Sequence, residues 1–102
     1  ALDGNEGRSA YSSAKAAMIA QAKVLSREVG KYNIRVNTIA PGLTDTDMMR
    51  KNTPKKIVDE VTSRISLKRT ANPEEIAKVA LLLYSDLSSY ITGQVIRVDG
   101  GI

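Results

Sequence analysis

The chain has 102 residues, of which 42% are hydrophobic and 25% charged, a composition and length that fit one small globular domain. It contains neither Cys nor His, which excludes disulfides, thiol nucleophiles, His bases and metal sites built from either residue. The net charge of +4 comes from scattered Lys and Arg, the only aromatics are Tyr, and no apolar run could span a bilayer. We therefore expect a cytoplasmic protein with no membrane and no nucleic-acid partner, whose acid–base groups are Tyr, Lys, Asp or Glu.

An alanine-rich stretch near the N-terminus predicts a helix from Ser9 to Val29, with Gly30 as its C-terminal stop. Tyr11 and Lys15 are four residues apart and so share one helix face, with Cβ atoms about 5–6 Å apart. An ammonium beside a phenol favours the phenolate, so the pair predicts a tyrosine that exchanges a proton near neutral pH. By themselves the two residues equally fit an ordinary solvated face. The apolar residues of the helix form one stripe at positions 14, 18, 22, 25 and 29.

A short run rich in β-branched residues, Ile34 to Ala40, predicts a strand that Pro41-Gly42 ends. Because only the three residues Lys31 to Asn33 connect Gly30 to this strand, the helix and the strand are typical of the second half of a parallel βαβ crossover. The loop at positions 41–47 would then lie at the carboxyl end of a parallel strand, where open α/β sheets bind ligands. An ordinary strand-ending turn is the alternative for this loop.

Two further helices and one strand complete the pattern. Thr53 and Pro54 predict the N-cap and first residue of a weak helix, and Asn72-Pro73-Glu74-Glu75 predicts a strong helix start. Residues 94–99 predict a last short strand closed by Gly100-Gly101. The expected order is helix, strand, helix, helix, strand, and two strands make a poor sheet by themselves. We interpret residues 1–102 as one partial α/β domain.

Four motifs follow one another along the chain: Tyr11-x-x-x-Lys15, the run from Asn33 to Gly42, the run from Asn72 to Ala77, and Thr92-Gly93-Gln94 followed by Val98-Asp99-Gly100-Gly101. Together they resemble the C-terminal part of a short-chain dehydrogenase/reductase, and within that family the 3-oxoacyl-[acyl-carrier-protein] reductases. The Tyr–Lys spacing differs from that of the related enoyl reductases, which usually separate the two residues more widely. The resemblance implies a fold: the C-terminal portion of a Rossmann-type, doubly wound parallel sheet, with the N-terminal half absent from this chain.

The resemblance implies an NAD(P)-dependent oxidoreductase that transfers hydride to a carbonyl. Tyr11 would be the general acid, assisted by Lys15, which would also hydrogen-bond the nicotinamide ribose. Residues 48–66 correspond to the substrate lid of the family. The positions that the resemblance assigns to cofactor binding are Tyr11, Lys15, Pro41, Gly42, Thr44 and Thr46.

The resemblance also implies NAD or NADP as cofactor, with NADP favoured by the subgroup, a small-molecule carbonyl or acyl-carrier substrate, and a homodimer or homotetramer. The family's glycine-rich phosphate loop and its catalytic Ser and Asn lie upstream of Ala1, so these 102 residues alone are expected to be incomplete for activity. A missing initiating Met favours a cut chain. Two alternatives stay open: a catalytically inactive fragment that acts as an interaction or scaffold module, and a basic polyanion-binding module.

Overall fold

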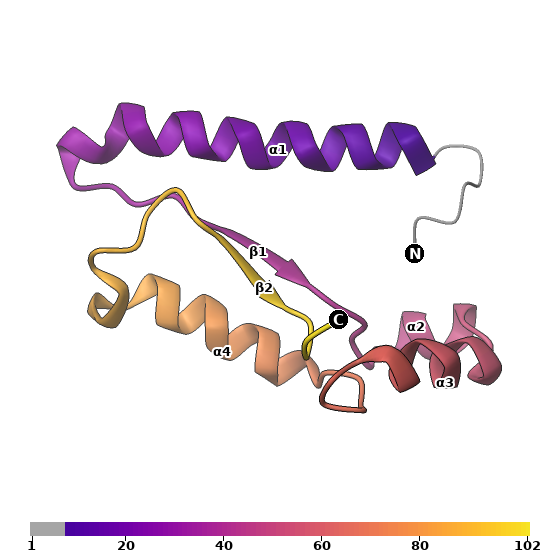
Figure 1. The fold of residues 1–102 in the computed structure, drawn as a ribbon. Helices are drawn as coiled ribbons and strands as arrows, with labels where there is room; N and C mark the ends of the chain where they lie inside the picture. The colour runs from indigo at the N-terminus through magenta and orange to yellow at the C-terminus, as the bar shows by residue number, and fades with distance from the viewer. Residues whose placement is uncertain (1–7) are drawn as a thin grey trace. The chain divides into compact units, whose positions relative to one another are not determined.

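The computed structural model describes residues 8–102 as an α/β arrangement with one pair of parallel strands (Figure 1). The chain divides into two compact units, each described here by itself. The first unit holds the chain up to Thr38 together with Tyr90–Val95, and the second holds Ile39–Ser89 together with Ile96–Ile102. The elements are α1 (Arg8–Val29), η1 (Gly30–Tyr32), β1 (Thr38–Pro41), α2 (Asp47–Asn52), α3 (Lys55–Arg64), α4 (Pro73–Tyr84), η2 (Asp86–Ser88) and β2 (Val95–Val98).

The first unit is built on the long helix α1, which begins one residue before the predicted start and ends at the predicted residue, Val29. Gly30 is the first residue after the α-helix, as predicted, although it does not take the left-handed conformation. The chain continues as the 3₁₀ turn η1, and Asn33 takes the left-handed conformation at φ 60°, with its N–H donating to the Gly30 carbonyl at 2.9 Å. Asn is the residue type besides Gly that adopts this conformation most readily.

Small side chains on α1 bring it close to the segment before β2. Ser26 is buried, and its hydroxyl donates to the Lys23 carbonyl at 2.6 Å. A Cβ added at Gly93 would lie 2.7 Å from Ser26 Oγ, so the glycine backbone rests directly on the helix. The predicted apolar stripe is only partly covered, since Met18 and Leu25 are exposed. An apolar stripe on a helix is fully buried only where a second element packs along its whole length.

The first strand lies further along the chain than predicted, at Thr38–Pro41 instead of residues 34–40. The residues before it bond to the facing loop instead of to a strand, partly through side chains and partly through the Val36 carbonyl, which accepts from the Gly93 N–H at 2.7 Å. Asn37 Nδ2 donates to the Ile91 carbonyl at 3.0 Å, and the Gln94 N–H donates to Asn37 Oδ1 at 3.1 Å. A β-branched run can therefore precede a strand without belonging to the ladder.

Strand β2, at Val95–Val98, lies within the predicted residues 94–99, and it pairs with β1 in parallel (Figure 1). The Thr38 N–H donates to the Gln94 carbonyl at 2.8 Å, and the Gly42 N–H donates to the Val98 carbonyl at 2.8 Å. The same offset at both ends is the register of a parallel pair.

The second unit contains α2, a six-residue helix that the sequence did not predict, besides the two helices that it did. Thr53 ends α2, with its N–H donating to the Met49 carbonyl at 2.9 Å, so the prediction that Thr53 caps the next helix is wrong by one residue. Pro54 takes that N-cap position, and α3 begins at Lys55. The start of α4 is confirmed: Asn72 is the N-cap, Pro73 comes first, and Glu75 completes a capping box.

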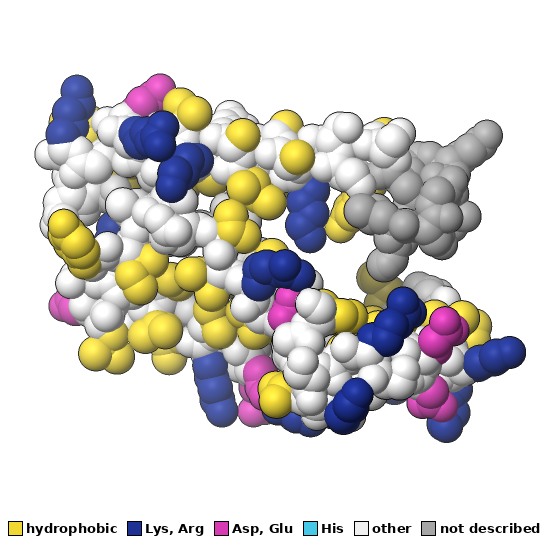
Figure 2. All heavy atoms as spheres, in the orientation of Figure 1, with side chains coloured by type: hydrophobic (Ala, Val, Ile, Leu, Met, Phe, Trp, Pro, Cys, Tyr) yellow, Lys and Arg dark blue, Asp and Glu magenta, His cyan; other side chains and the backbone are white. Residues whose placement is uncertain are grey.

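Hydrophobic burial in this unit centres on Ile65, which is 2% exposed and is the one fully buried hydrophobic side chain among residues 8–102. Apolar side chains gather at the surface over α4 and η2, where Leu81, Leu82 and Leu87 are exposed (Figure 2). Such patches mark surfaces that other protein normally covers. None of the helices within residues 8–102 has the length and hydrophobicity needed to cross a membrane.

Candidate active site

Helix α1 carries Tyr11 and Lys15 as the sequence predicted, four residues apart and therefore on one face. Tyr11 is 58% exposed and Lys15 is also exposed. The phenol can donate or accept a hydrogen bond, and the ammonium carries three donors. This face of α1 therefore presents a proton donor and a fixed positive charge to a ligand.

In the second unit, the loop after β1 begins with Pro41 and Gly42. The backbone at Gly42 approaches the other strand so closely that a Cβ there would lie 2.8 Å from both Cα and Cβ of Asp99. The sequence motif Pro41-Gly42 thus has a structural cause, because only a residue without Cβ fits against Asp99. The close approach also fixes the path of the loop that follows.

That loop is held by its own backbone and hydroxyls. Thr44 Oγ1 donates to the Gly42 carbonyl at 3.0 Å, and Thr44 forms an isolated parallel bridge with Ala71. Thr46 Oγ1 accepts from the Met49 N–H at 3.1 Å and so caps α2. The predicted site residues 41–46 therefore form one ordered run in the second unit, while Tyr11 and Lys15 belong to the first.

Beside this run, the Arg50 guanidinium forms ion pairs with Asp45 and Asp47. The hydrogen bond that Arg50 donates to Asp47, followed by the one that it donates to Asp45, raises the pKa of Arg50 above its already high ordinary value. Since two carboxylates neutralise this arginine, the positive charge here is already compensated. The arrangement ties the start of α2 to the loop and offers little net attraction to an anion.

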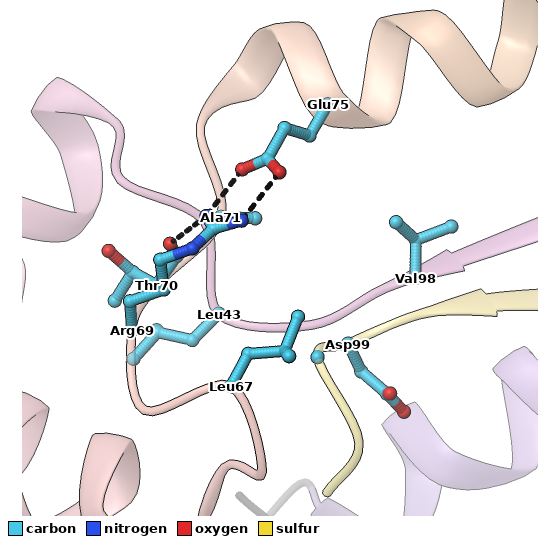
Figure 3. Close-up of a pocket in the computed structure, with 9 residues that line it drawn as sticks. Leu43, Leu67, Arg69, Thr70, Ala71, Glu75, Val98 and Asp99 are labelled. Atoms are coloured by element: carbon cyan, nitrogen blue, oxygen red, sulfur yellow. Dashed lines mark hydrogen bonds and ion pairs between the residues drawn. The ribbon is translucent and has the colours of Figure 1, made fainter.

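A pocket of about 90 Å³ lies beside the loop in the second unit, with Arg69 and Glu75 along one side (Figure 3). The guanidinium meets the carboxylate in two parallel hydrogen bonds, from Nη1 to Oε1 at 2.7 Å and from Nη2 to Oε2 at 2.8 Å. The hydrogen bond from Arg69, followed by that from the Asn72 N–H, lowers the pKa of Glu75 from 4.5 to about 2. Glu75 is therefore ionised throughout the physiological range.

Glu75 was predicted only as an acidic residue in the first turn of a helix, and no role was predicted for Arg69. The spacing in the sequence could have indicated the pair. Arg69 lies three residues before the N-cap Asn72, and from there its side chain can extend over the start of the helix to Glu75, the third helical residue. The other side of the pocket is apolar, with Leu43, Leu67 and Val98 (Figure 3).

Asp99 lines the same pocket, but its carboxylate points away from the ion pair (Figure 3). The Gly101 N–H donates to Asp99 Oδ1 at 3.0 Å and, with Arg97 nearby, lowers the pKa of this carboxyl below its ordinary value. Asp99 therefore acts as a charged acceptor that shapes the turn at Gly100 and Gly101, both of which have positive φ. Within residues 8–102 no three His, Cys, Asp or Glu side chains are grouped so as to hold a metal ion.

Comparison with known proteins gives matches over the full chain. Residues 1–102 match the model of the family described as enoyl-(acyl carrier protein) reductase. The 3-oxoacyl-[acyl-carrier-protein] reductase of Chlamydia trachomatis is 54% identical over 101 residues, which are 99% of this chain and 40% of that protein. The (3R)-3-hydroxyacyl-CoA dehydrogenase of Mus musculus is 40% identical over 97% of this chain and 38% of its own length.

Solved structures give the same result. The crystal structure of a 3-oxoacyl-[acyl-carrier protein] reductase from Brucella melitensis superposes with a TM-score of 0.85 at 39% identity, over 90% of this chain and 34% of that one. The chain spans about 40% of the length of the curated relatives that it matches. Its helices and parallel strands correspond to a portion of the Rossmann-type fold, which confirms the predicted fold class.

Proposed function

The chain belongs to the short-chain dehydrogenase/reductase family, and we propose that the protein containing it is an NAD(P)-dependent oxidoreductase that reduces a carbonyl group by hydride transfer. One observation carries the proposal: α1 of this family member exposes Tyr11 and Lys15 on one face, four residues apart. No His or Cys is present to serve as an alternative proton donor within the chain.

In the proposed mechanism, Tyr11 is the general acid. Its O–H bond breaks as the proton moves to the carbonyl oxygen, while a nicotinamide cofactor, when bound, supplies the hydride to the carbonyl carbon. The phenolate that remains on Tyr11 is stabilised by the Lys15 ammonium, and a proton from solvent restores it. General acid catalysis of this kind contributes about 10²- to 10⁴-fold in rate.

The residues of this chain fit the nicotinamide end of such a cofactor. Lys15 and Tyr11 offer donors for ribose hydroxyls, and Gly42 leaves its backbone without a side chain. We assign the backbone at Thr44 to the carboxamide, Pro41 and Gly42 to the nicotinamide turn, and Thr46 to the neighbourhood of the phosphates. NADP is the favoured form, by likeness to the 3-oxoacyl reductases.

For the substrate we propose a 3-oxoacyl group, carried as an acyl thioester, that the lid at residues 48–66 covers. The support is the name of the relatives at 43–54% identity, 3-oxoacyl-[acyl-carrier-protein] reductase. Helices α2 and α3 lie within that lid segment. We further propose a homodimer or homotetramer of the full-length protein, which would cover apolar surface such as that over α4. The cytoplasmic location stays a prediction.

The experiment is a comparison of Tyr11→Phe with Tyr32→Phe in the full-length protein, with NADPH and a 3-oxoacyl thioester. Tyr32 is a matched control because it is 65% exposed and has its own lysine, with Lys31 Nζ 5.2 Å from the ring centroid. We expect Tyr11→Phe to lower kcat by about 10²- to 10⁴-fold, with thermal unfolding unchanged, and Tyr32→Phe to lower neither. A Tyr11→Phe protein with the unmodified rate would refute the role of Tyr11.

A non-catalytic interaction module is the second candidate, and the exposed apolar side chains of α4 and η2 favour it. The same assay separates the two candidates. An unmodified full-length protein that neither binds nor oxidises NADPH or NADH would favour the interaction module.

A further inference from the structure

The backbone of the Leu43–Asp45 segment is hydrogen-bonded on both sides of Thr44 to one residue, Ala71. The Ala71 N–H donates to the Leu43 carbonyl at 3.0 Å, and the Ala71 carbonyl accepts from the Asp45 N–H at 2.8 Å. Thr44 lies between these two bonds and is the residue bridged to Ala71. The position of the Thr44 backbone therefore depends on how the two peptide groups on either side of Ala71 are oriented.

The Arg69–Glu75 ion pair contacts both of these peptide groups from their other side. Arg69 Nη1 donates to the Thr70 carbonyl at 3.2 Å, and this carbonyl belongs to the same peptide group as the Ala71 N–H. Glu75 Oε1 accepts from the Asn72 N–H at 2.9 Å, and this N–H belongs to the same peptide group as the Ala71 carbonyl. Because a peptide group is planar, fixing one of its polar atoms sets the direction of the other.

The pair is better suited to orientation than to stability. The Arg69 and Glu75 side chains are 51% and 35% exposed, and exposed ion pairs contribute about 0–1 kcal/mol to folding. Its two-pronged geometry, in contrast, fixes the guanidinium plane relative to the carboxylate. A contact of this kind restricts a loop more than it strengthens a fold.

We propose that Arg69 and Glu75 are positioning residues for cofactor binding: as one ion pair they orient the peptide groups flanking Ala71 and so place Leu43–Asp45 for the nicotinamide carboxamide. The inference deepens the proposed function and rests on it, because it takes Thr44 as the residue that meets the cofactor. Neither Arg69 nor Glu75 takes part in proton or hydride transfer.

The test uses the full-length protein with Arg69→Met, Glu75→Gln and the double variant, and measures the Kd for NADPH by fluorescence together with kcat at saturating NADPH. Glu75→Gln keeps an oxygen that can accept from the Asn72 N–H while it removes the charge that pairs with Arg69. Glu74→Gln is the matched control, since it removes the same charge from the same first turn of α4, and Glu74 is exposed.

Each single variant should raise the Kd about 3- to 30-fold, while kcat at saturation changes by less than about twofold because Tyr11 is untouched. The Kd of the double variant for NADPH should be no higher than the higher Kd of the two single variants, because the two residues act as one pair. Hydrogen exchange at the Ala71 and Asp45 amides should become faster in all three. Glu74→Gln should leave the Kd and these two amides unchanged.

Variants with the unmodified Kd and amide exchange would overturn the proposal, even if their unfolding temperature fell, because the pair would then be structural only. An equal rise of Kd in Glu74→Gln would also overturn it, by showing a general effect of charge. Failure of the proposed function would look different: the unmodified protein itself would bind neither NADPH nor NADH.

Discussion

The two regions that carry the predicted site residues are held in opposite ways. On α1, Tyr11 and Lys15 project from a regular helix, and their side chains are exposed. In the segment from Gly42 to Asp45, the backbone itself is fixed, by the bond from Gly42 to Val98, the close approach to Asp99 and the two bonds to Ala71. The helix α1 therefore presents exposed side chains that can react, whereas residues 42–45 present a backbone whose position is fixed by its contacts.

Because the two regions are held differently, substitutions in them should separate activity from stability. A side chain exposed on a helix can be shortened at little cost in folding, since surface changes usually stay within about 0.5 kcal/mol. A residue whose backbone is fitted against another strand cannot be enlarged without moving that strand. Changes on α1 should therefore alter catalysis or cofactor binding without altering stability, while changes in the loop should alter stability and binding together.

Gly42→Ala gives the largest expected effect on folding. The new Cβ would lie 2.8 Å from both Cα and Cβ of Asp99, so β1 and β2 must shift apart. We expect a loss of about 1–3 kcal/mol in the free energy of unfolding, measured by denaturant unfolding of the full-length protein. Gly30→Ala is the control, because a Cβ there meets no atom within 4 Å, and it should be neutral or slightly stabilising. If Gly42→Ala and Gly30→Ala were equally stable, the backbone at Gly42 would not be held more tightly than the backbone at the end of α1.

Lys15→Ala should give a smaller effect, on cofactor binding and not on stability. Loss of a charged donor should weaken NADPH binding roughly tenfold. The unfolding temperature should stay as it is, since Lys15 is exposed. Lys31→Ala provides the control on the same unit. An unchanged Kd for NADPH in Lys15→Ala would argue against a role of Lys15 in holding the cofactor.

The smallest expected effect is the loss, on acidification, of the contribution that the Arg69–Glu75 ion pair makes to the free energy of unfolding. The pKa of Glu75 is lowered from 4.5 to about 2, chiefly by Arg69. A carboxylate with a lowered pKa stabilises the fold above its unfolded-state value and loses that contribution as the pH falls from 4.5 towards 2. The difference in unfolding free energy between the unmodified protein and Glu75→Gln should therefore be constant near neutral pH and shrink below about pH 4. A difference independent of pH would contradict the ion pair as its source.

The sequence predicted α1 and the start of α4 well, because their signals are local, but it missed the short helix α2. The Ala-rich stretch placed α1 to within one residue, and Asn72-Pro73 with Glu75 placed the start of α4. It misplaced β1 because strand pairing depends on the partner: Asn37 and the residues before it bond to the loop at Ile91–Gln94 instead of to a strand. The hydrophobic pattern of residues 34–40 does not indicate which segment they will bond to.

The same limit applies to the candidate site. Tyr11 and Lys15 could be found because their relation is a helical spacing. The contact of Gly42 with Asp99 joins residues far apart in sequence, and so does the bridge from Thr44 to Ala71. Arg69 could not be assigned because its partner, Glu75, already had a sufficient explanation as an acidic residue in the first turn of a helix.

The most direct measurement follows the hydride. The full-length protein would be given NADPH deuterated at both C4 positions together with a 3-oxoacyl thioester or, separately, a 2-enoyl thioester, and the products would be analysed by mass spectrometry. We expect one deuterium on the carbon that bears the new hydroxyl of the 3-hydroxyacyl product, and no labelled product from the enoyl substrate. Label only in a saturated acyl product, or in neither product, would contradict this expectation.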